Sequence, residues 1–221
     1  FCRAICKQLL AEKGISVGSH ILSISDVKDN SFGVNIDGNT LENLTKEVFP
    51  LLDKSKFEPM RKIIAQAREQ GDSVGGVIEC GISGLQGGVG EPFFDSIESR
   101  LASLLFSVPA VKGVQFGKGY GLTTMKGSEA NDPFEFVDGK VVTKTNNNGG
   151  ILGGISTGMP IVFNVAIKPT ASIFKEQDSI NIKTKENTKL TIQGRHDSCI
   201  VVRAIPVIES VAAIAIYDFL R

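Results

Sequence analysis

The chain has 221 residues and a mass of 23.6 kDa, enough for a buried core in one large domain or two small ones. Hydrophobic residues make up 42% and charged residues 22% of the sequence, a globular composition that argues against global disorder. The 24 basic and 24 acidic residues cancel, and no basic stripe stands out, which disfavours a nucleic-acid-binding protein.

Membrane and metal partners are also disfavoured. No apolar run approaches the ~20 residues of a membrane-spanning helix, and the most apolar stretch, 201–220, is broken by charged residues and a proline. No signal peptide is visible. The four cysteines are scattered and there are only two histidines, so we expect neither a disulfide framework nor a metal site. A reduced, cytoplasmic protein is the expectation.

Apolar spacing predicts the helices. The expected helices cover residues 1–13, a segment from a Thr40 cap to about 52, a segment with Pro59 in its first turn ending near 70, a segment capped by Asp95 and closed by Pro109, and a final helix from near Pro206. The first of these has no Ser, Thr, Asp or Asn ahead of it as a cap, so we expect the chain to be part of a longer one.

Strands are predicted between these helices. The expected strands cover residues 15–27, 73–82, 110–116 and 161–167. Two hairpins are expected, one at 134–143 around Asp138-Gly139 and one with strands 179–184 and 189–193 around Glu186-Asn187. Because helices mix with hairpins and no regular βαβ alternation is seen, we predict an α+β fold, a sandwich of helices and antiparallel sheets in one domain, 1–221.

Glycine is the unusual component, at 24 residues, and it clusters. The clusters are Gly84–Pro92, Pro109–Gly121, Asn146–Gly158 followed by Lys168–Ser172, and Gly194–Cys199. Such segments let backbone N–H groups approach a phosphate, although tight turns and close packing also require glycine. Known phosphate codes do not match: neither Gly-Lys pair is followed by Ser or Thr, and residues 117–121 read GxGxG rather than GxGxxG.

Five side chains invite a chemical interpretation. Lys168, with hydroxyls following at 170 and 172, suits an anion, and the guanidinium of Arg195 suits phosphate or carboxylate. His196 is a candidate proton donor or acceptor, whereas a Cys199 nucleophile is rejected because neighbours in sequence do not make a catalytic pair. His20 lies in a predicted strand and is expected to be a buried, hydrogen-bonded structural residue.

Together these segments resemble the chorismate synthase family over nearly the whole chain. The motifs that carry the resemblance are Gly88-Val-Gly-Glu-Pro-Phe-Phe-Asp95, Val108-Pro-Ala-Val-Lys-Gly113, Asn148-Gly-Gly-Ile-Leu-Gly-Gly-Ile-Ser156, Lys168-Pro-Thr-Ala-Ser172 and Gly194-Arg-His-Asp197. The resemblance implies an anti-1,4 elimination of phosphate from 5-enolpyruvylshikimate 3-phosphate to give chorismate, in the shikimate pathway of aromatic biosynthesis. It also implies reduced FMN as cofactor and a homotetramer. Whether NADPH or an external reductant supplies the electrons stays open.

The resemblance carries site residues over by position. It implies flavin contacts from Pro109, Ala110, Gly153, Lys168, Pro169, Thr170, Ala171, Ser172 and Arg195. Arg195 would also contact the substrate, and Asp197 would be catalytic, assisting proton transfer through flavin N5. A cation beside a departing phosphate and a carboxylate beside a reduced flavin are chemically suited to these roles.

Two departures from the family pattern set the alternatives. Ser198 stands where the family usually has proline, which removes no chemical group. The family's Gly-Glu-Ser-His-Gly and Arg-Ser-Ser-Ala-Arg motifs are missing from this sequence, and neither histidine matches the catalytic pair. We therefore expect residues 1–221 alone to be inactive. The alternatives are a non-catalytic FMN-binding or assembly fragment and, less favoured, a generic flavin oxidoreductase.

Overall fold

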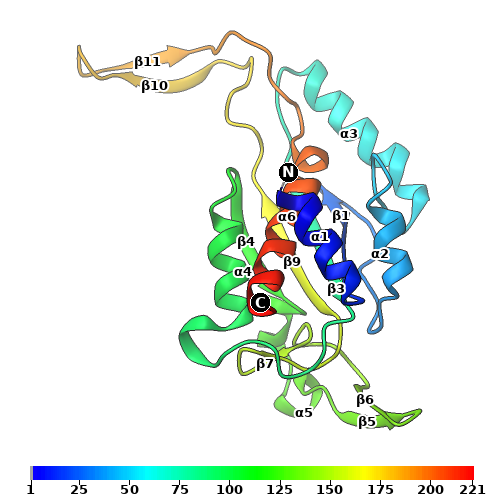
Figure 1. The fold of residues 1–221 in the computed structure, drawn as a ribbon. Coiled ribbons are helices and arrows are strands. Elements are labelled where there is room, and N and C mark those ends of the chain that lie inside the picture. The colour runs from blue at the N-terminus through cyan, green and yellow to red at the C-terminus, as the bar shows by residue number, and fades with distance from the viewer. Residues whose placement is uncertain (1) are drawn as a thin grey trace.

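The computed structural model describes the backbone of residues 2–221 and the side chains from Ile5 onward. Its centre is a five-stranded antiparallel sheet in the order β2-β1-β3-β9-β4 (Figure 1). The strands of this sheet are β1 (Ser16–Ile24), β2 (Val27–Lys28), β3 (Gly76–Ser83), β4 (Val111–Phe116) and β9 (Ile161–Ile167). Three two-stranded ribbons accompany it: β5 (Phe134–Val137) with β6 (Lys140–Thr143), β7 (Ile151–Leu152) with β8 (Ile155–Ser156), and β10 (Gln177–Asn181) with β11 (Glu186–Leu190).

Helices lie against both faces of this sheet. The helices are α1 (Cys2–Glu12), α2 (Gly38–Leu44), α3 (Phe57–Glu69), α4 (Ile97–Phe106), α5 (Gly127–Ala130) and α6 (Val201–Phe219), with 3₁₀ turns at Lys54–Lys56, Phe93–Asp95 and Gly119–Thr124. The long helix α6 packs on β1 and β3 and is flanked by α1 and α4, whereas α2 packs on β1 and buries Leu41 in a small second cluster. The expected α+β architecture is confirmed.

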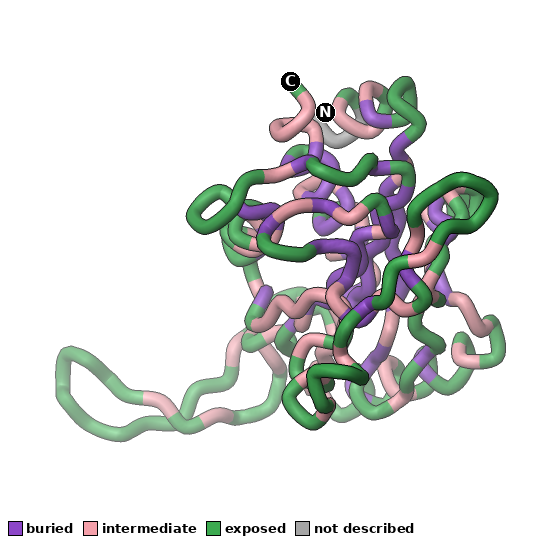
Figure 2. Tube along the Cα trace, turned by 90° about the horizontal axis from the view of Figure 1, so that it is seen from below, coloured by how far each residue is buried: buried purple, intermediate pink, exposed green. Residues whose placement is uncertain are grey.

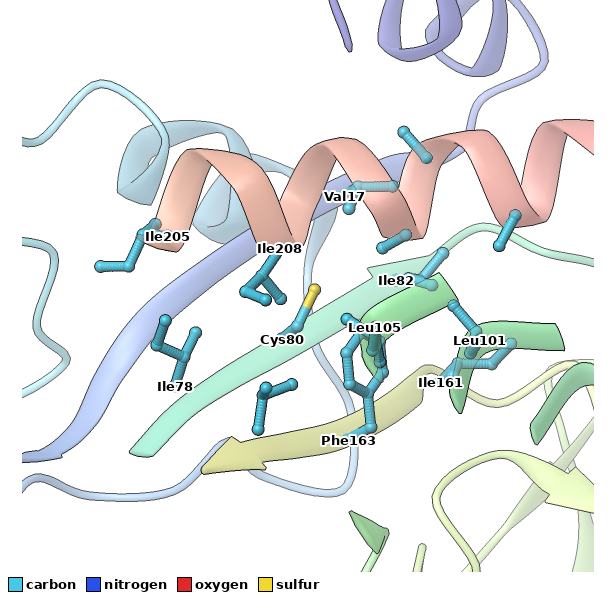
Figure 3. Packing of buried hydrophobic residues seen from close by; sticks show 14 of the residues in the cluster. Val17, Ile78, Cys80, Ile82, Leu101, Leu105, Ile161, Phe163, Ile205 and Ile208 are labelled. Atoms are coloured by element: carbon cyan, nitrogen blue, oxygen red, sulfur yellow. The ribbon is translucent and has the colours of Figure 1, made fainter. Parts of the chain in front are cut away.

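The main core lies between α6 and one face of the sheet. Alternate residues of the central strands point to it, among them Ile78, Cys80 and Ile82 of β3 and Phe163 of β9, and they meet Ile208 of α6 (Figure 3). Burial raises the pKa of the Cys80 thiol to about 12, so this cysteine is a neutral packing residue.

A buried carboxylate fastens α6 to its neighbours. Glu209 is fully buried; one oxygen accepts the Ser19 N–H of β1 at 3.0 Å and the other pairs with Lys7 Nζ of α1 at 2.9 Å. A buried charge is tolerated when it is paired in this way. Glu209 therefore fixes the position of α6 relative to both α1 and the sheet.

Several sequence predictions are confirmed to the residue or nearly so. The hairpin 134–143 and the strand 161–167 have the expected bounds, and Pro59 lies in the first turn of α3. Of the expected first helix, residues 2–12 are helical, and Phe1 lies outside the described residues.

Two predicted helix starts were wrong because another residue occupies the cap position. The helix expected from Thr40 to about 52 begins after Asp37 and ends at Leu44, so Thr40 lies inside it. The cap of α4 is Ser96, whose hydroxyl accepts the Ser99 N–H at 3.0 Å, and Asp95 belongs to the preceding 3₁₀ turn.

Two other predicted bounds were displaced. The final helix begins at Val201, so Pro206 lies within its second turn. The last hairpin turns earlier than expected, because the Asn181 side chain accepts the N–H groups of Lys183 and Thr184 and reverses the chain there. Glu186-Asn187 therefore belongs to β11 and not to a loop.

Hairpin β10–β11 projects from the body of the molecule, with almost all its residues exposed (Figures 1 and 2). Among the described helices, none has the length and apolar character needed to cross a membrane.

Candidate flavin and phosphate site

The end of the central strand β9 brings together two of the predicted segments. Lys168 follows the last residue of β9, and its backbone N–H donates to the Ala110 carbonyl at 2.9 Å. Ala110 has φ +73°, an uncommon value for a residue with a side chain, and it forms the turn between α4 and β4. The segments 109–110 and 168–169 are thus neighbours, as the sequence prediction requires.

A loop that the sequence did not single out, residues 71–75, packs on the same strand end. Ser73 Oγ donates to the Thr170 carbonyl at 2.6 Å, and the Phe174 N–H donates to the Gly71 carbonyl at 3.0 Å. Gly75 has no room for a side chain, because a Cβ there would lie 2.4 Å from the Ile167 carbonyl oxygen. This loop therefore fixes the path of 168–174 from the side of β3.

The segment 194–199 joins the same cluster. The Ser198 carbonyl accepts the Val74 N–H at 2.8 Å. The ring of His196 packs edge-on against Phe174 with centroids 5.0 Å apart, and its Nε2 lies 3.2 Å from the Ile192 carbonyl oxygen. Loop 71–75 is accordingly the contact that draws 168–174 and 194–199 together.

The charged side chains of this cluster differ in whether they have an ion-pair partner. Asp197 forms an ion pair with Arg203 in the first turn of α6, with both side chains exposed. The side chains of Lys168 and Arg195 are also exposed, and neither has an ion-pair or hydrogen-bond partner among the described side chains, from Ile5 onward. Two cations are therefore free to meet an anion, whereas the aspartate is already held by a guanidinium.

One buried polar atom in the cluster lacks a partner. Thr170 Oγ1 is inaccessible to solvent and makes no hydrogen bond with any described group. A buried hydroxyl without a partner is unfavourable by about 1–3 kcal/mol, so such an atom points to a ligand. An orphaned hydroxyl beside two exposed cations fits a phosphorylated, hydrogen-bonding group such as FMN. Ala171 is exposed and Ser172 partly buried in the same loop.

Gly153 lies apart from this cluster. It forms the turn between β7 and β8, and its neighbour Gly154 accepts the Ile97 N–H at the start of α4, whereas Pro109 follows the end of that helix. The β7–β8 ribbon precedes the first residue of β9 and Lys168 follows the last, a separation of roughly 20 Å along the strand. Within this chain the structure does not bring Gly153 to the other predicted flavin contacts, and its role stays a prediction.

The remaining glycine clusters meet one another at that far end of β9. A Cβ on Gly117 would lie 2.1 Å from the Asn147 carbonyl oxygen, and Ser156 exchanges backbone hydrogen bonds of 2.8 Å with Gly88 and Val89. Close packing of backbone on backbone therefore explains these glycines. The glycine-rich segments thus divide between the two ends of β9, with 109–110, 168–172 and 194–199 at one end and 84–92, 117–121 and 146–158 at the other.

Cys199 is unsuited to nucleophilic chemistry, as expected. Burial raises the pKa of its thiol, and the opposing effect of the hydrogen bond from the Val201 N–H is smaller. The thiol therefore stays protonated at neutral pH. The contacts of Ser73 and Arg203 were missed by sequence reasoning. Their only local signals are a Gly-Asp-Ser turn after a helix and an arginine in a helix's first turn.

Comparison with known proteins agrees with the motifs. Residues 1–220 match the family model described as chorismate synthase. The chorismate synthase of Methanosarcina barkeri is 43% identical over 215 residues, covering 97% of this chain and 58% of the relative. That of Thermococcus kodakarensis is 44% identical over 214 residues with the same shares, and that of Lancefieldella parvula is 40% identical over 227 residues, covering 98% and 60%.

A solved structure agrees as well. The crystal structure of a chorismate synthase superposes with a TM-score of 0.80 at 27% identity, over 99% of this chain and 60% of that one. The chain thus spans about 58–60% of the length of the relatives it matches. Since the family model covers nearly every residue, this chain belongs to the chorismate synthase family.

Proposed function

We propose that this chain forms part of a chorismate synthase, a lyase that removes phosphate from 5-enolpyruvylshikimate 3-phosphate in an anti-1,4 elimination and yields chorismate. The observation that carries the proposal is that 168–172 contacts 109–110 and loop 71–75, and that loop 71–75 also contacts 194–198, with two unpaired cations and the orphaned Thr170 hydroxyl. Family membership supports the same reaction and its place in aromatic biosynthesis.

In this proposal the cluster holds reduced FMN. Lys168 and Arg195 would pair with anionic groups, the Thr170 hydroxyl and Ser172 would hydrogen-bond, and Pro109-Ala110 and Pro169-Ala171 would supply backbone and apolar surface. The flavin, when bound, supplies electron density to the allylic system of the substrate. The elimination itself consumes no electrons overall, but the flavin must be in its reduced form. NADPH is the reductant we would test first.

The roles of Arg195 and Asp197 follow from charge. A phosphate that leaves as an anion is stabilised by a guanidinium already in place, which is the role proposed for Arg195 at the substrate. Asp197 would hold or move a proton at its carboxylate. The Arg203 guanidinium pairs with Asp197 and would hold that carboxylate in place.

Replacing Asp197 with Asn in the full-length enzyme tests the assignment. Asp197→Asn keeps shape but removes the proton acceptor, so we expect elimination to slow by about 10²–10⁴-fold. FMN affinity and thermal unfolding should stay within about twofold and about 2 °C of wild type, since the residue is exposed. Glu186→Gln on the distant hairpin is the matched control. An unchanged elimination rate in Asp197→Asn would make the residue structural only.

The isolated polypeptide 1–221 separates the proposal from its alternative. Because the family's Gly-Glu-Ser-His-Gly motif does not occur in this sequence, we propose that 1–221 alone shows no turnover. If 1–221 binds FMN, and neither 1–221 nor the full-length protein catalyses the elimination, a non-catalytic FMN-binding or assembly role is favoured instead. The proposal includes a cytoplasmic homotetramer, for which light scattering of the full-length protein is the measurement.

A further inference from the structure

A row of polar side chains crosses the sheet on the face turned away from α6. His20 of β1 is the register partner of Glu79 of β3, Glu79 of Asn164 of β9, and Asn164 of Gln115 of β4. Residues one position along each strand, such as Cys80 and Phe163, point to the core instead. Four strands thus present one continuous polar line, and three of its four residues, His20, Glu79 and Asn164, are buried.

A cavity of about 680 Å³ lies over this row. Its polar wall includes Asn164, Gln115, Asn146, Asn147, Lys28 and Lys118. This volume is in the range of small-molecule sites. Among the described residues that line it, none belongs to the proposed flavin site.

Asn164 is the polar group that needs an occupant. Its residue is 9% exposed and its Oδ1 has no hydrogen-bond partner among the described groups, although it lines the cavity. A carboxamide oxygen placed there without a donor destabilises the fold, which an N–H or O–H from a bound molecule would reverse. The acceptor therefore specifies a hydrogen-bond donor on the ligand.

The carboxylates beneath the cavity are already engaged. His20 lies between Asp29 and Glu79, with its Nδ1 3.2 Å from Asp29 Oδ2 and its Nε2 2.8 Å from Glu79 Oε2. The same Glu79 oxygen accepts the Phe32 N–H at 2.6 Å. Asp29 further accepts the N–H groups of residues 30, 52 and 53. These acids are therefore poor sites for a cation, and the cavity offers its amides and lysines.

Two lysines set the sign of the ligand's charge. Lys28 stands on the edge strand β2 and Lys118 just beyond the opposite edge strand β4, and both are exposed. Neither forms an ion pair with any described acidic group. A molecule lying over the amide row would thus have a cation available at either side.

We infer that this cavity binds a small organic anion that carries hydroxyl groups. A hydroxyl donates to Asn164 Oδ1, Gln115 hydrogen-bonds beside it, and a carboxylate or phosphate pairs with Lys118. Asn164 lies on β9, four positions before Lys168 in the sequence. The inference does not depend on the proposed elimination.

Titration calorimetry of the full-length protein tests this inference. The probes are quinate, a hydroxylated carboxylate, and glycerol 3-phosphate, a hydroxylated phosphate without a carboxylate, with uncharged myo-inositol as the comparison. We expect saturable binding of at least one anion, weaker binding of myo-inositol, and lower affinity at higher salt. Which anion binds distinguishes a carboxylate site from a phosphate site.

Variants locate the binding. Asn164→Leu keeps the volume but removes the acceptor, so we expect at least a tenfold loss of affinity with thermal stability equal to or above wild type. Lys118→Met should weaken binding at least threefold and reduce the salt dependence of the affinity. Lys140→Met, on the exposed β5–β6 hairpin, is the control and should change neither the affinity nor its salt dependence. If neither anion binds saturably up to tens of millimolar, or if Asn164→Leu binds as wild type does, the inference is wrong.

Discussion

Asp132 provides the sharpest test of how the loop at the far end of β9 is held. Its Oδ1 accepts the Thr145 hydroxyl at 2.6 Å and the Asn147 N–H at 2.7 Å, and its Oδ2 accepts the N–H and the side-chain amide of Asn148 at 2.9 and 2.8 Å. Desolvation of this carboxyl alone would raise its pKa, but these hydrogen bonds together outweigh it and lower the pKa. One buried carboxylate thus organises the loop that packs against Gly117.

Asp132→Asn should cost about 3 kcal/mol. The substitution keeps one oxygen but turns an NH₂ group toward two donors, so two charge-assisted bonds are lost and a buried donor is left unsatisfied. For a chain of this size that corresponds to a fall in the melting temperature of about 6–12 °C. Asp178→Asn, on an exposed hairpin residue with one lysine partner, is the control and should shift it by less than about 2 °C.

The effect has a defined pH dependence. Because the folded-state pKa of Asp132 lies below its unfolded value, its stabilisation is present above about pH 4 and is lost as the pH falls through the folded pKa. The gap in melting temperature between wild type and Asp132→Asn should therefore be constant from about pH 5 to 8 and close below about pH 4. Differential scanning calorimetry across this range measures it. A variant that melts within about 1 °C of wild type at neutral pH, or a gap that persists in acid, would refute the reasoning.

Two further substitutions probe other buried contacts. His20→Leu removes the imidazole that lies between two buried carboxylates, so the free energy of unfolding should fall by about 3–5 kcal/mol in urea denaturation; a loss below about 1 kcal/mol would mean that water replaces the imidazole. Gly117→Ala places a Cβ 2.1 Å from the Asn147 carbonyl at φ +53° and should cost at least about 2 kcal/mol, whereas Gly127→Ala, with no atom within 4 Å, should be near neutral. Equal melting temperatures for the two alanine variants would show that the backbone at 117 can move aside.

Local signals predicted the elements that depend on neighbouring residues alone. The Asp138-Gly139 turn has φ +50° and +76°, the conformation that this pair favours, and so the hairpin 134–143 was found to the residue. Helix starts failed where two candidate caps stood close together. Asp37 and Thr40 both suit a cap, and packing of Leu41 against the sheet selects the earlier start.

The assembled site depends on contacts that sequence spacing does not contain. The hydrogen bonds from Ser73 to Thr170 and from Val74 to Ser198 join residues about a hundred positions apart, and no periodicity reports them. The motif resemblance singled out these segments but did not predict that they divide between two ends of a strand. The polar row across the sheet was missed for the same reason: Glu79, Asn164 and Gln115 each stand between two apolar residues of a strand, and only the register aligns them.

Strand β9 fixes the starting point of both groups of segments, but the two groups differ in how far their backbones can move. It is paired on one side with β3 and on the other with β4, so its backbone is hydrogen-bonded along both edges, and its Phe163 side is buried in the main core. Such a central strand opens last in a folded protein, whereas its ends lead into loops that open more readily. The backbone at Lys168 is therefore held in place by the end of β9, whereas the residues after Lys168 can adjust to a ligand. At the other end, the interlocked glycine backbones leave the 146–158 segment little freedom, which suits a rigid wall for the cavity over Asn164.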